Sequence, residues 1–336
     1  MLRIAVVILN YNGENLLRQF LPSVIRHSGS ASLYVADNGS TDSSVRLLET
    51  EFPDLQIIRL PANYGFCKGY NEALRQVQAD VYILLNSDIE VTAGWLDPIQ
   101  ACFTRDSRIA AVQPRICAFS HKNMFEYAGA GGGLIDSLGY PFCRGRIFDT
   151  VEEDRGQYND EREIFWASGA CLAIRSEVYH RLGGLDEDFF AHMEEIDLCW
   201  RIQRAGQSIY YTGQSVVYHL GAGTLGYANP KKTWLNFRNN LLMLYKHYAF
   251  WELVVKLPLR ILLDWAAALY FSVTGCFANT VAIFRAHLAF IRMTVSYRKK
   301  RNAIQKAWPS YPKRQIYRGL ILVDYYVKRR KVYRNQ

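Results

Sequence analysis

Two short acidic clusters, about a hundred residues apart, contain the side chains best suited to chemistry. The first is Asn86-Ser87-Asp88, which follows the apolar run 81–85, and the second is the Glu-Glu-Ile-Asp sequence of residues 194–197. The first cluster places a carboxylate at the C-terminal end of a predicted buried strand, where open α/β sheets bind ligands. The second places carboxylates at the start of a predicted helix. The chain therefore offers an acid that can hold a cation and a separate general base.

We expect Asp88 to bind a divalent cation, Mg²⁺ or Mn²⁺, because such an ion needs few protein ligands when it also contacts phosphates. Asn86 stands where a second acid would fit, and its amide oxygen can hydrogen-bond a ribose or a cation-bound water. His219 follows the predicted strand 208–217 and is a candidate second ligand. The competing interpretation of His219 is a structural histidine.

Glu195 is our candidate for the general base, which would take a proton from an attacking hydroxyl. Glu194 is the alternative candidate. Acidic residues in the first turn of a helix also complement the helix dipole, so a purely structural role competes with both assignments.

Polar residues follow other predicted strands as well. Asp37 ends a strand in the stretch VADNGSTD and can accept hydrogen bonds from a nucleobase or ribose, although the same residues would also form a helix-capping turn. Arg238 can clamp a phosphate, as can Arg144 and Arg146, with an exposed structural role as the alternative. Further candidates near the same sheet edge are Asn10, Asn12, Asn63, Gly65 and Asn71.

Alternating strand and helix signals across residues 1–113 predict the frame that positions these side chains. Such alternation indicates a mostly parallel sheet with helices on both faces. Strands are expected at 4–9, 32–36, 56–60, 81–85 and 110–113, and helices at 14–27, 42–51 and 65–77. The glycine-rich residues 114–165 indicate an inserted region of loops and a hairpin. Further elements are expected at 175–182, 194–205 and 208–217.

The motifs of two common nucleotide-binding classes are missing from the sequence. It contains no GxGxxG and no GxxxxGK[ST], which counts against a dinucleotide dehydrogenase and a P-loop enzyme. The seven cysteines form no CxxC pair, which is typical of reduced thiols rather than of a zinc site or disulfide framework. The first apolar run, 4–9, is too short for a signal peptide. We therefore expect a cytoplasmic protein.

The C-terminal region differs in composition from the rest of the chain. Residues 292–336 contain 14 Lys and Arg and a single acid, so the basic excess of the whole chain (+9) lies in this tail. Before it, charged residues recur every four positions from 252 to 264 among apolar ones, which predicts a narrow charged stripe on an apolar helix. Residues 265–284 contain no charge and could span a bilayer.

An apolar helix followed by a basic segment is typical of a peripheral membrane anchor. We favour this interpretation over a transmembrane span, and we expect an anionic membrane surface as partner. A basic tail also suits nucleic acid, but the apolar stretch in front of it argues against that partner.

Taken in order, the motifs resemble family 2 glycosyltransferases, in particular bacterial rhamnosyltransferase-like enzymes of surface-polysaccharide synthesis. The resemblance covers about residues 3–245, and its motifs keep their order and spacing. The matching stretches are VVILNYNG, VADNGSTD, NYGFCKGYNEAL, ILLNSDIEV, FWASGACLAIRS, GGLDEDFFAHMEEIDLCWRIQRAG and VVYHLGAGTL.

The resemblance implies a GT-A fold, a nucleoside-diphosphate sugar donor linked to UDP or dTDP, a divalent cation, and transfer with inversion. Asp37 matches the nucleoside-binding acid, Asp88 the metal-binding acid, Glu195 the base and His219 a metal ligand. Asn86 replaces the first acid of the DxD-type motif, which is the one departure. The residues expected around the donor are Asn10, Asn12, Asp37, Asn63, Gly65, Asn71, Asn86, Ser87, Asp88, Trp166, Gly169 and Arg238.

We therefore expect a GT-A domain over 1–240 and a helical, membrane-associating region over 241–336. The expected acceptor is a glycan or a polyprenyl-linked glycan at the cytoplasmic face of the inner membrane. A non-catalytic scaffold that retains the transferase fold and a sugar nucleotidyltransferase are the rival hypotheses. The second rival would need a basic glycine-rich loop after the first strand, where this chain has Asn10-Tyr11-Asn12-Gly13-Glu14.

Overall fold

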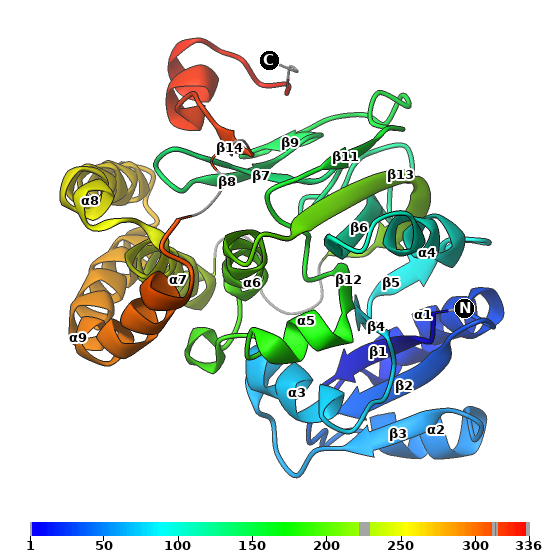
Figure 1. The fold of residues 1–336 in the computed structure, drawn as a ribbon. Helices are drawn as coiled ribbons and strands as arrows, with labels where there is room; N and C mark the ends of the chain where they lie inside the picture. The colour runs from blue at the N-terminus through cyan, green and yellow to red at the C-terminus, as the bar shows by residue number, and fades with distance from the viewer. Residues whose placement is uncertain (1, 222–228, 311–312, 314, 334–336) are drawn as a thin grey trace.

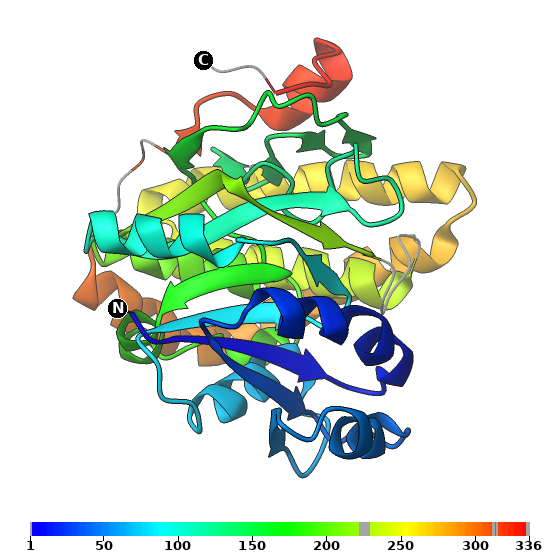
Figure 2. The same ribbon diagram turned by 90° about the vertical axis from the view of Figure 1, so that its right-hand side faces the viewer.

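The computed structural model describes residues 2–221, 229–310, 313 and 315–333. The chain forms a nine-stranded sheet, a smaller five-stranded sheet and a group of three C-terminal helices, which Figure 1 shows on one side of the large sheet. Figure 2 shows the opposite side, where α1 and α4 cover the sheet. The VVYHLGAGTL stretch is described only up to Gly221.

The first half of the large sheet is parallel, as predicted. Its strands are β1 (Ile4–Asn10), β2 (Ser32–Asp37), β3 (Gln56–Arg59) and β4 (Val81–Asn86), in the order β4-β1-β2-β3. The helices between them are α1 (Glu14–His27), α2 (Ser44–Glu51) and α3 (Gly65–Leu74). Successive side chains of a strand point to opposite faces. Val6 of β1 therefore packs in the core under α1 and α2, whereas Val7 packs in the core under α3.

The second half of the sheet is mixed, which corrects the expectation of a mostly parallel sheet. The strand β12 (Cys171–Arg175) lies between β4 and β6 (Ile109–Ala118) and runs antiparallel to both. Its residues form a continuous apolar run because both faces are buried, and such a run reveals burial but not direction. At the far edge, β13 (Ser208–His219) runs parallel to β6 and antiparallel to β5 (Ile89–Val91) and β11 (Glu161–Glu163).

Three helices complete this half of the large sheet. The helix α4 (Leu96–Arg105) was not anticipated from the sequence, whereas α5 (Ser176–Arg181) and α6 (Glu194–Arg204) occupy segments where helices were expected. The helix α4 is short and begins with a proline in its first turn, and its apolar positions pack on the sheet face shared with α1.

The inserted region forms a second sheet rather than loops and one hairpin. Its strands are β7 (Gly133–Asp136), β8 (Pro141–Cys143), β9 (Arg146–Ile147), β10 (Thr150–Val151) and β14 (Ile316–Tyr317). The last of these comes from the C-terminal tail and pairs parallel with β7. Arg144 and Arg146 are buried here, Arg144 between the rings of Tyr158 and Tyr211 and Arg146 on the carbonyl of Tyr127. Both arginines therefore hold the insertion together and are not exposed.

The C-terminal helices are α7 (Pro230–His247), α8 (Phe250–Val273) and α9 (Phe277–Ala307). The uncharged segment 265–284 is divided between α8 and α9 by a turn at Gly275, whose φ is +80°. Within the described part of the chain, no helix is long and apolar enough to cross a membrane. The domain boundary expected at residue 240 falls inside α7.

The charged stripe of α8 faces the protein interior. Arg260 and Asp264 are buried and form an ion pair with 2.9 Å between Nε and Oδ1. The guanidinium of Arg260 also donates to Oδ1 of Asn240 (2.7 Å) and lies over the ring of Tyr140, while Asp264 contacts His287 of α9. Because the charges point inward, apolar side chains on the other side of α8, such as Val255, Leu259 and Leu262, are exposed.

A buried ion-pair cluster joins α6 to α7. The carboxylate of Asp197 is fully buried and lies 2.8 Å from Nζ of Lys246, 2.9 Å from Nε of Arg201 and 3.0 Å from Nε2 of His247. Burial by itself would raise the pKa of Asp197, but the charges of Lys246 and Arg201 and the hydrogen bond of His247 hold it well below its usual range. Lys246 also contacts Asp186 at 2.6 Å. The cluster fixes α7 against the start of α6.

We predict that Lys246→Met destabilises the protein by about 3 kcal/mol, because it removes the buried cation that two carboxylates share and leaves Asp197 with Arg201 and Asp186 with Lys300. Urea unfolding followed by circular dichroism would measure the loss. The control is Arg3→Met, since Arg3 pairs with Asp80 at an exposed site and this change should leave the unfolding midpoint unchanged. Equal midpoints for Lys246→Met and the wild type would contradict the prediction.

Candidate active site

The ends of β1 and β2 bring two predicted residues together. Asn10 and Asp37 are paired in the strand register, and Nδ2 of Asn10 donates to Oδ1 of Asp37 (3.2 Å). The other carboxylate oxygen of Asp37 accepts from the backbone N–H of Ser40 (3.0 Å). Oδ1 of Asn10 is buried and has no hydrogen-bond partner within the described structure. A buried acceptor without a partner is costly, so this oxygen is a natural point of contact for a ligand donor.

Three other predicted residues shape the loops around this point. Oδ1 of Asn12 accepts from the backbone N–H of Thr41 (2.7 Å), which ties the loop after β1 to the loop after β2. Oδ1 of Asn63 accepts from the N–H of Gly65 (2.9 Å) at the start of α3. Gly65 has φ +74°, and a Cβ there would lie 2.5 Å from the ring of Phe190. These residues therefore set the backbone geometry of the sheet edge.

Asn71, by contrast, is buried and hydrogen-bonds only within the protein. Its Nδ2 donates to the carbonyl of Leu185 (2.9 Å) and to Glu187, and its Oδ1 accepts from the hydroxyl of Tyr179 (2.6 Å) and the N–H of Leu185. Every polar atom of the Asn71 side chain is thus used inside the protein. The structure places it as a link between α3 and the turn after α5.

At the end of β4, Asp88 meets His219 and a residue that sequence reasoning missed, Glu126. Oδ1 of Asp88 lies 3.1 Å from Nε2 of His219, and Nδ1 of His219 lies 3.1 Å from Oε2 of Glu126, outside hydrogen-bond alignment. The strands β5 and β13 create this meeting, because His219 pairs with Ile89 beside Asp88. All three side chains are buried. Glu126 lies in the insertion, where no local pattern marks it.

Asn86 and Ser87 lie in the same corner of the sheet. Nδ2 of Asn86 is 3.5 Å from Nε2 of His219. Oγ of Ser87 lies 3.9 Å from the position that a Cβ of Gly13 would take, and the same Cβ would lie 2.3 Å from Oδ1 of Asn10. The ends of β1 and β4 are therefore adjacent, and Gly13 leaves space between them.

Burial and charge act against each other in this corner. Burial disfavours the charged form of Asp88, but the hydrogen bond and charge of His219 outweigh it and lower its pKa. Burial likewise disfavours the His219 imidazolium, yet the neighbouring carboxylates of Asp88 and Glu126 raise its pKa to about 10. In the absence of a cation, a proton on His219 therefore offsets part of the charge of the two carboxylates.

The positions of Asp88 and His219 suit a shared divalent cation. Two neighbouring ligands of an octahedral ion, each about 2.1 Å from it, stand roughly 3 Å apart. The 3.1 Å between Oδ1 of Asp88 and Nε2 of His219 agrees with this separation. A carboxylate suits Mg²⁺ and Mn²⁺, and a neutral imidazole is a common metal ligand in proteins. Binding would displace the proton of His219, so occupancy would fall at low pH.

The second acidic cluster follows a segment of unusual backbone conformation. Phe190, His192 and Met193 all have φ between +66° and +73°, a region that residues other than glycine rarely occupy. Asn239 of α7 holds this segment, since its Nδ2 lies 2.8–3.0 Å from the carbonyl oxygens of Phe189, Ala191 and His192. The segment ends at Met193, the N-cap of α6, and therefore fixes where the next two residues point.

Glu194 and Glu195 form a buried acidic pair at the start of α6. Oε2 of each is buried without a hydrogen-bond partner in the described structure, although the Glu195 side chain as a whole is partly exposed. Burial raises the pKa of Glu195 to about 7. Burial and the neighbouring charge of Glu195 raise the pKa of Glu194 well above its ordinary value. A carboxylate with a pKa near neutrality is well suited to accept a proton.

A short backbone segment joins the two acidic clusters. The N–H of Asn86 donates to the carbonyl of Ala170 (3.0 Å), and the preceding residue, Gly169, lies so close to α6 that its Cβ would be 3.8 Å from Cβ of Glu195. The structure therefore brings the end of β4 and the Glu194–Glu195 pair to two sides of one segment, although they are about a hundred residues apart in sequence.

The remaining predicted residues, Trp166 and Arg238, are buried and hydrogen-bond to backbone carbonyls. Trp166 is buried against Gly133 and donates from Nε1 to the carbonyl of Leu134 (2.8 Å). Arg238 is buried, and its Nη2 donates to the carbonyls of Asp188 (3.0 Å) and Phe189 (3.1 Å). Arg238 therefore holds the segment that leads to Glu194, which is a different contact from the phosphate clamp considered for it.

Comparison with known proteins places this geometry among transferases. The family profile described as "Glycosyl transferase family 2" matches residues 5–183, more than half of the chain. The N-acetylglucosaminyl-diphospho-decaprenol L-rhamnosyltransferase of Mycobacterium tuberculosis is 28% identical over 239 residues, which cover 65% of this chain and 76% of that protein.

Two solved structures share the fold. The structure titled GalNAc-T7 with UDP, GalNAc and Mn²⁺ aligns with a TM-score of 0.56 and 18% identity, covering 73% of this chain and 48%, about half, of that one. The mannosyltransferase PcManGT from Pyrobaculum calidifontis, in complex with GDP-Man and Mn²⁺, aligns with a TM-score of 0.53 and 16% identity. That alignment covers 92% of this chain and 88% of the other. The mixed sheet is thus of the GT-A type.

Proposed function

The chain belongs to glycosyl transferase family 2 and is a glycosyltransferase, and from this premise we propose how it works. It moves a sugar from a nucleoside diphosphate to a hydroxyl of a glycan or lipid-linked glycan during cell-surface polysaccharide synthesis, with inversion at the anomeric carbon. The observation that carries this proposal is the placement of the Asp88–His219 corner and the Glu194–Glu195 pair on two sides of the segment 168–170. One group can hold the donor and the other can activate the acceptor.

The donor lies along the C-terminal edge of the parallel strands. Asp37 and the unpartnered Oδ1 of Asn10 bind the nucleoside, and the glycine at position 13 leaves room for its approach. Asp88 and His219 hold a divalent cation, Mg²⁺ or Mn²⁺, and both similar structures contain Mn²⁺. When bound, this cation neutralises charge that develops on the departing diphosphate.

Glu195 acts as the general base. Its carboxylate takes the proton of the acceptor hydroxyl, whose oxygen attacks the anomeric carbon on the face opposite the diphosphate. Glu194 is the neighbouring carboxyl group, and burial and the charge of Glu195 raise its pKa well above the ordinary value.

The names of the relatives guide the choice of substrates. The mycobacterial relative is named for transfer of L-rhamnose to N-acetylglucosaminyl-diphospho-decaprenol. We extend this to a rhamnose or other hexose donor linked to dTDP or UDP, and to a polyprenyl-linked acceptor. Such an acceptor places the protein at the cytoplasmic face of the inner membrane, bound peripherally. In this proposal residues 1–240 carry the chemistry and 241–336 associate with the membrane.

The exposed face of α8 and α9 supports the membrane proposal. Their outward side chains are large and apolar, up to 76% exposed for Trp251 and 80% for Val295. Apolar patches of this extent on a surface usually mark an interaction site. The exposed members include Phe250, Trp251, Val254, Val255, Leu259, Leu262, Trp265, Leu269, Tyr270, Val273, Phe277, Val281, Phe284, Leu288, Ile291 and Val295.

The role of Asp88 predicts donor-dependent stabilisation. With the donor at about 100 times its Kd, the wild type with Mn²⁺ should gain about 2.7 kcal/mol, seen as a rise in Tm in a panel of UDP- and dTDP-sugars. Asp88→Asn should lose most of this rise. Asp80→Asn, at the opposite end of β4, should keep it. A full rise in Asp88→Asn would refute the role of Asp88.

The pKa of Glu195 predicts the pH dependence of transfer. The base must be deprotonated, so kcat/KM should increase with pH and level off above a pKa near 7. Glu195→Gln should lower kcat by roughly 10²–10⁴-fold, remove this pH step and still bind donor. The control is Glu177→Gln, because Glu177 is an exposed first-turn glutamate of α5. Unchanged transfer by Glu195→Gln would favour a different base.

The exposed α8–α9 face predicts binding to vesicles. Replacing Trp251 and Val255 with Gln should weaken binding to phosphatidylglycerol vesicles in co-sedimentation by at least roughly thirtyfold, because each of the two apolar side chains that enters the interface contributes about 1–3 kcal/mol. Tyr11→Gln, an exposed aromatic residue next to β1, is the control. Equal co-sedimentation of all three proteins would exclude this face as the membrane contact.

A further inference from the structure

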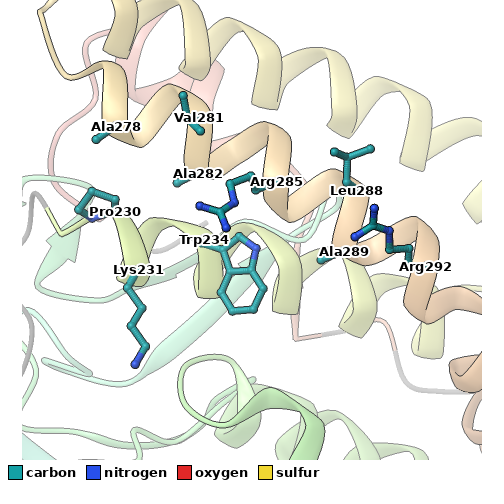
Figure 3. A pocket seen from close by; sticks show the side chains of 10 residues that line it. All are labelled: Pro230, Lys231, Trp234, Ala278, Val281, Ala282, Arg285, Leu288, Ala289 and Arg292. Carbon is teal, nitrogen blue, oxygen red and sulfur yellow. The ribbon is translucent and has the colours of Figure 1, made fainter.

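We propose that the groove between α7 and α9 binds the diphosphate and the first isoprenoid units of a lipid-linked acceptor. This inference rests on the proposed transfer to a polyprenyl-linked glycan and adds the place where that acceptor docks. The groove has a volume of about 550 Å³ and lies between the first turns of α7 and the first half of α9 (Figure 3). Its lining residues are Pro230, Lys231, Trp234, Ala278, Val281, Ala282, Arg285, Leu288, Ala289 and Arg292.

The charged residues of the groove are all cations. Lys231, Arg285 and Arg292 line it, and none of the described lining residues is acidic; Figure 3 shows the Lys231 side chain directed away from α9. Within the described part of the chain, none of these three side chains forms an ion pair, in contrast to buried Arg260 and Lys246. Figure 3 shows the Arg285 side chain directed from α9 towards Trp234 of α7. Unpaired guanidinium groups are well suited to phosphate oxygens, which they can bind through two parallel hydrogen bonds.

The rest of the groove wall is apolar and continues into the exposed face described above. Val281 and Leu288 line the groove and are each 54% exposed, so they belong to both surfaces. A chain of isoprenoid units leaving the membrane-facing side of α9 would stay in contact with apolar side chains until its diphosphate reached the arginines. A free phosphate or sugar would leave these apolar walls in contact with water.

The groove is connected to the catalytic residues through α7. Lys231 extends to the ring of Phe190, with 5.3 Å between Nζ and the ring centre, and Phe190 belongs to the strained segment before Glu194. Trp234 packs on Arg238, whose guanidinium lies 4.3 Å from the ring centre and binds the carbonyls of Asp188 and Phe189. A diphosphate in the groove would therefore lie against the helix that holds the segment before Glu194.

These features favour one occupant, an amphiphile with a diphosphate head, over a general anionic membrane. Ordinary surface attraction to anionic lipid needs only exposed cations at the membrane contact, and α9 offers those at Arg298 and Lys299, outside the groove. The groove cations are exposed as well, but they lie beside the apolar walls that α7 and α9 provide. The groove therefore fits a ligand that carries both a compact double phosphate and a hydrocarbon chain.

The test compares two charge-matched double variants of the full chain. Arg285→Ala with Arg292→Ala removes two cations from the groove, and Arg298→Ala with Lys299→Ala removes two exposed cations from the same helix outside it. Transfer is measured with a polyprenyl-diphosphate-linked sugar in detergent micelles. The groove variant should raise the acceptor KM at least about tenfold while the donor KM stays within twofold, since two charge-assisted hydrogen-bonding groups are lost. The control variant should leave both values within twofold.

A binding measurement makes the inference independent of transfer. Geranylgeranyl diphosphate should quench the tryptophan fluorescence of the wild type, and it should bind the groove variant at least about tenfold more weakly. Geranylgeraniol and inorganic diphosphate serve as partial ligands, and each should bind more weakly than the complete amphiphile.

Three results would overturn the inference. The first is an unchanged acceptor KM in the groove variant. The second is an equal increase of the acceptor KM in the control variant, which would indicate general attraction to anionic surfaces. The third is binding of inorganic diphosphate as tight as that of geranylgeranyl diphosphate. Failure of the proposed function looks different, because the wild type would then transfer no sugar to any acceptor. In that case the geranylgeranyl diphosphate measurement still decides whether the groove binds such a lipid.

Discussion

The backbone of residues 190–193 is the constraint on which the rest of the site depends. Three residues other than glycine are held there in the left-handed region, at a cost of order 1–3 kcal/mol each. Asn239 donates to the carbonyls of Ala191 and His192 in this segment, and Arg238 donates to the carbonyls of the two residues before it. The cluster around Asp197 fixes α7, which carries Arg238 and Asn239, against α6. The C-terminal helix α7 is therefore part of the machinery that aims Glu194 and Glu195.

The two acidic clusters illustrate how environment separates chemically similar groups. Asp88 and Glu195 are both carboxylates in desolvated positions, and burial alone would raise the pKa of each. Asp88 faces His219, which keeps it ionised, whereas at Glu195 the effect of burial dominates and raises the pKa to about 7. In the function that we propose, the first group stays negative to hold a cation and the second can exchange a proton.

The helices α8 and α9 reverse the usual arrangement of a globular surface. The pair Arg260–Asp264 is buried, while large apolar side chains such as Trp251 and Val295 are exposed. Buried ion pairs fix geometry more than they stabilise a fold. The tail also contributes β14 to the second sheet, so this region is attached to the catalytic part at both α7 and β14. A surface presented by α8 and α9 therefore keeps a defined position relative to the catalytic residues.

The sequence alone determined the parallel half of the sheet, because short apolar runs that alternate with amphipathic segments are typical of parallel strands joined by helices. It also identified the chemical candidates Asp37, Asp88, Glu194, Glu195 and His219. It did not determine the antiparallel direction of β12, since a strand buried on both faces has the same pattern in either direction. Nor did it reveal Glu126 beside His219 or Asn239 beneath residues 189–192. Those contacts join residues 47–93 positions apart, and only tertiary packing decides which distant side chains meet.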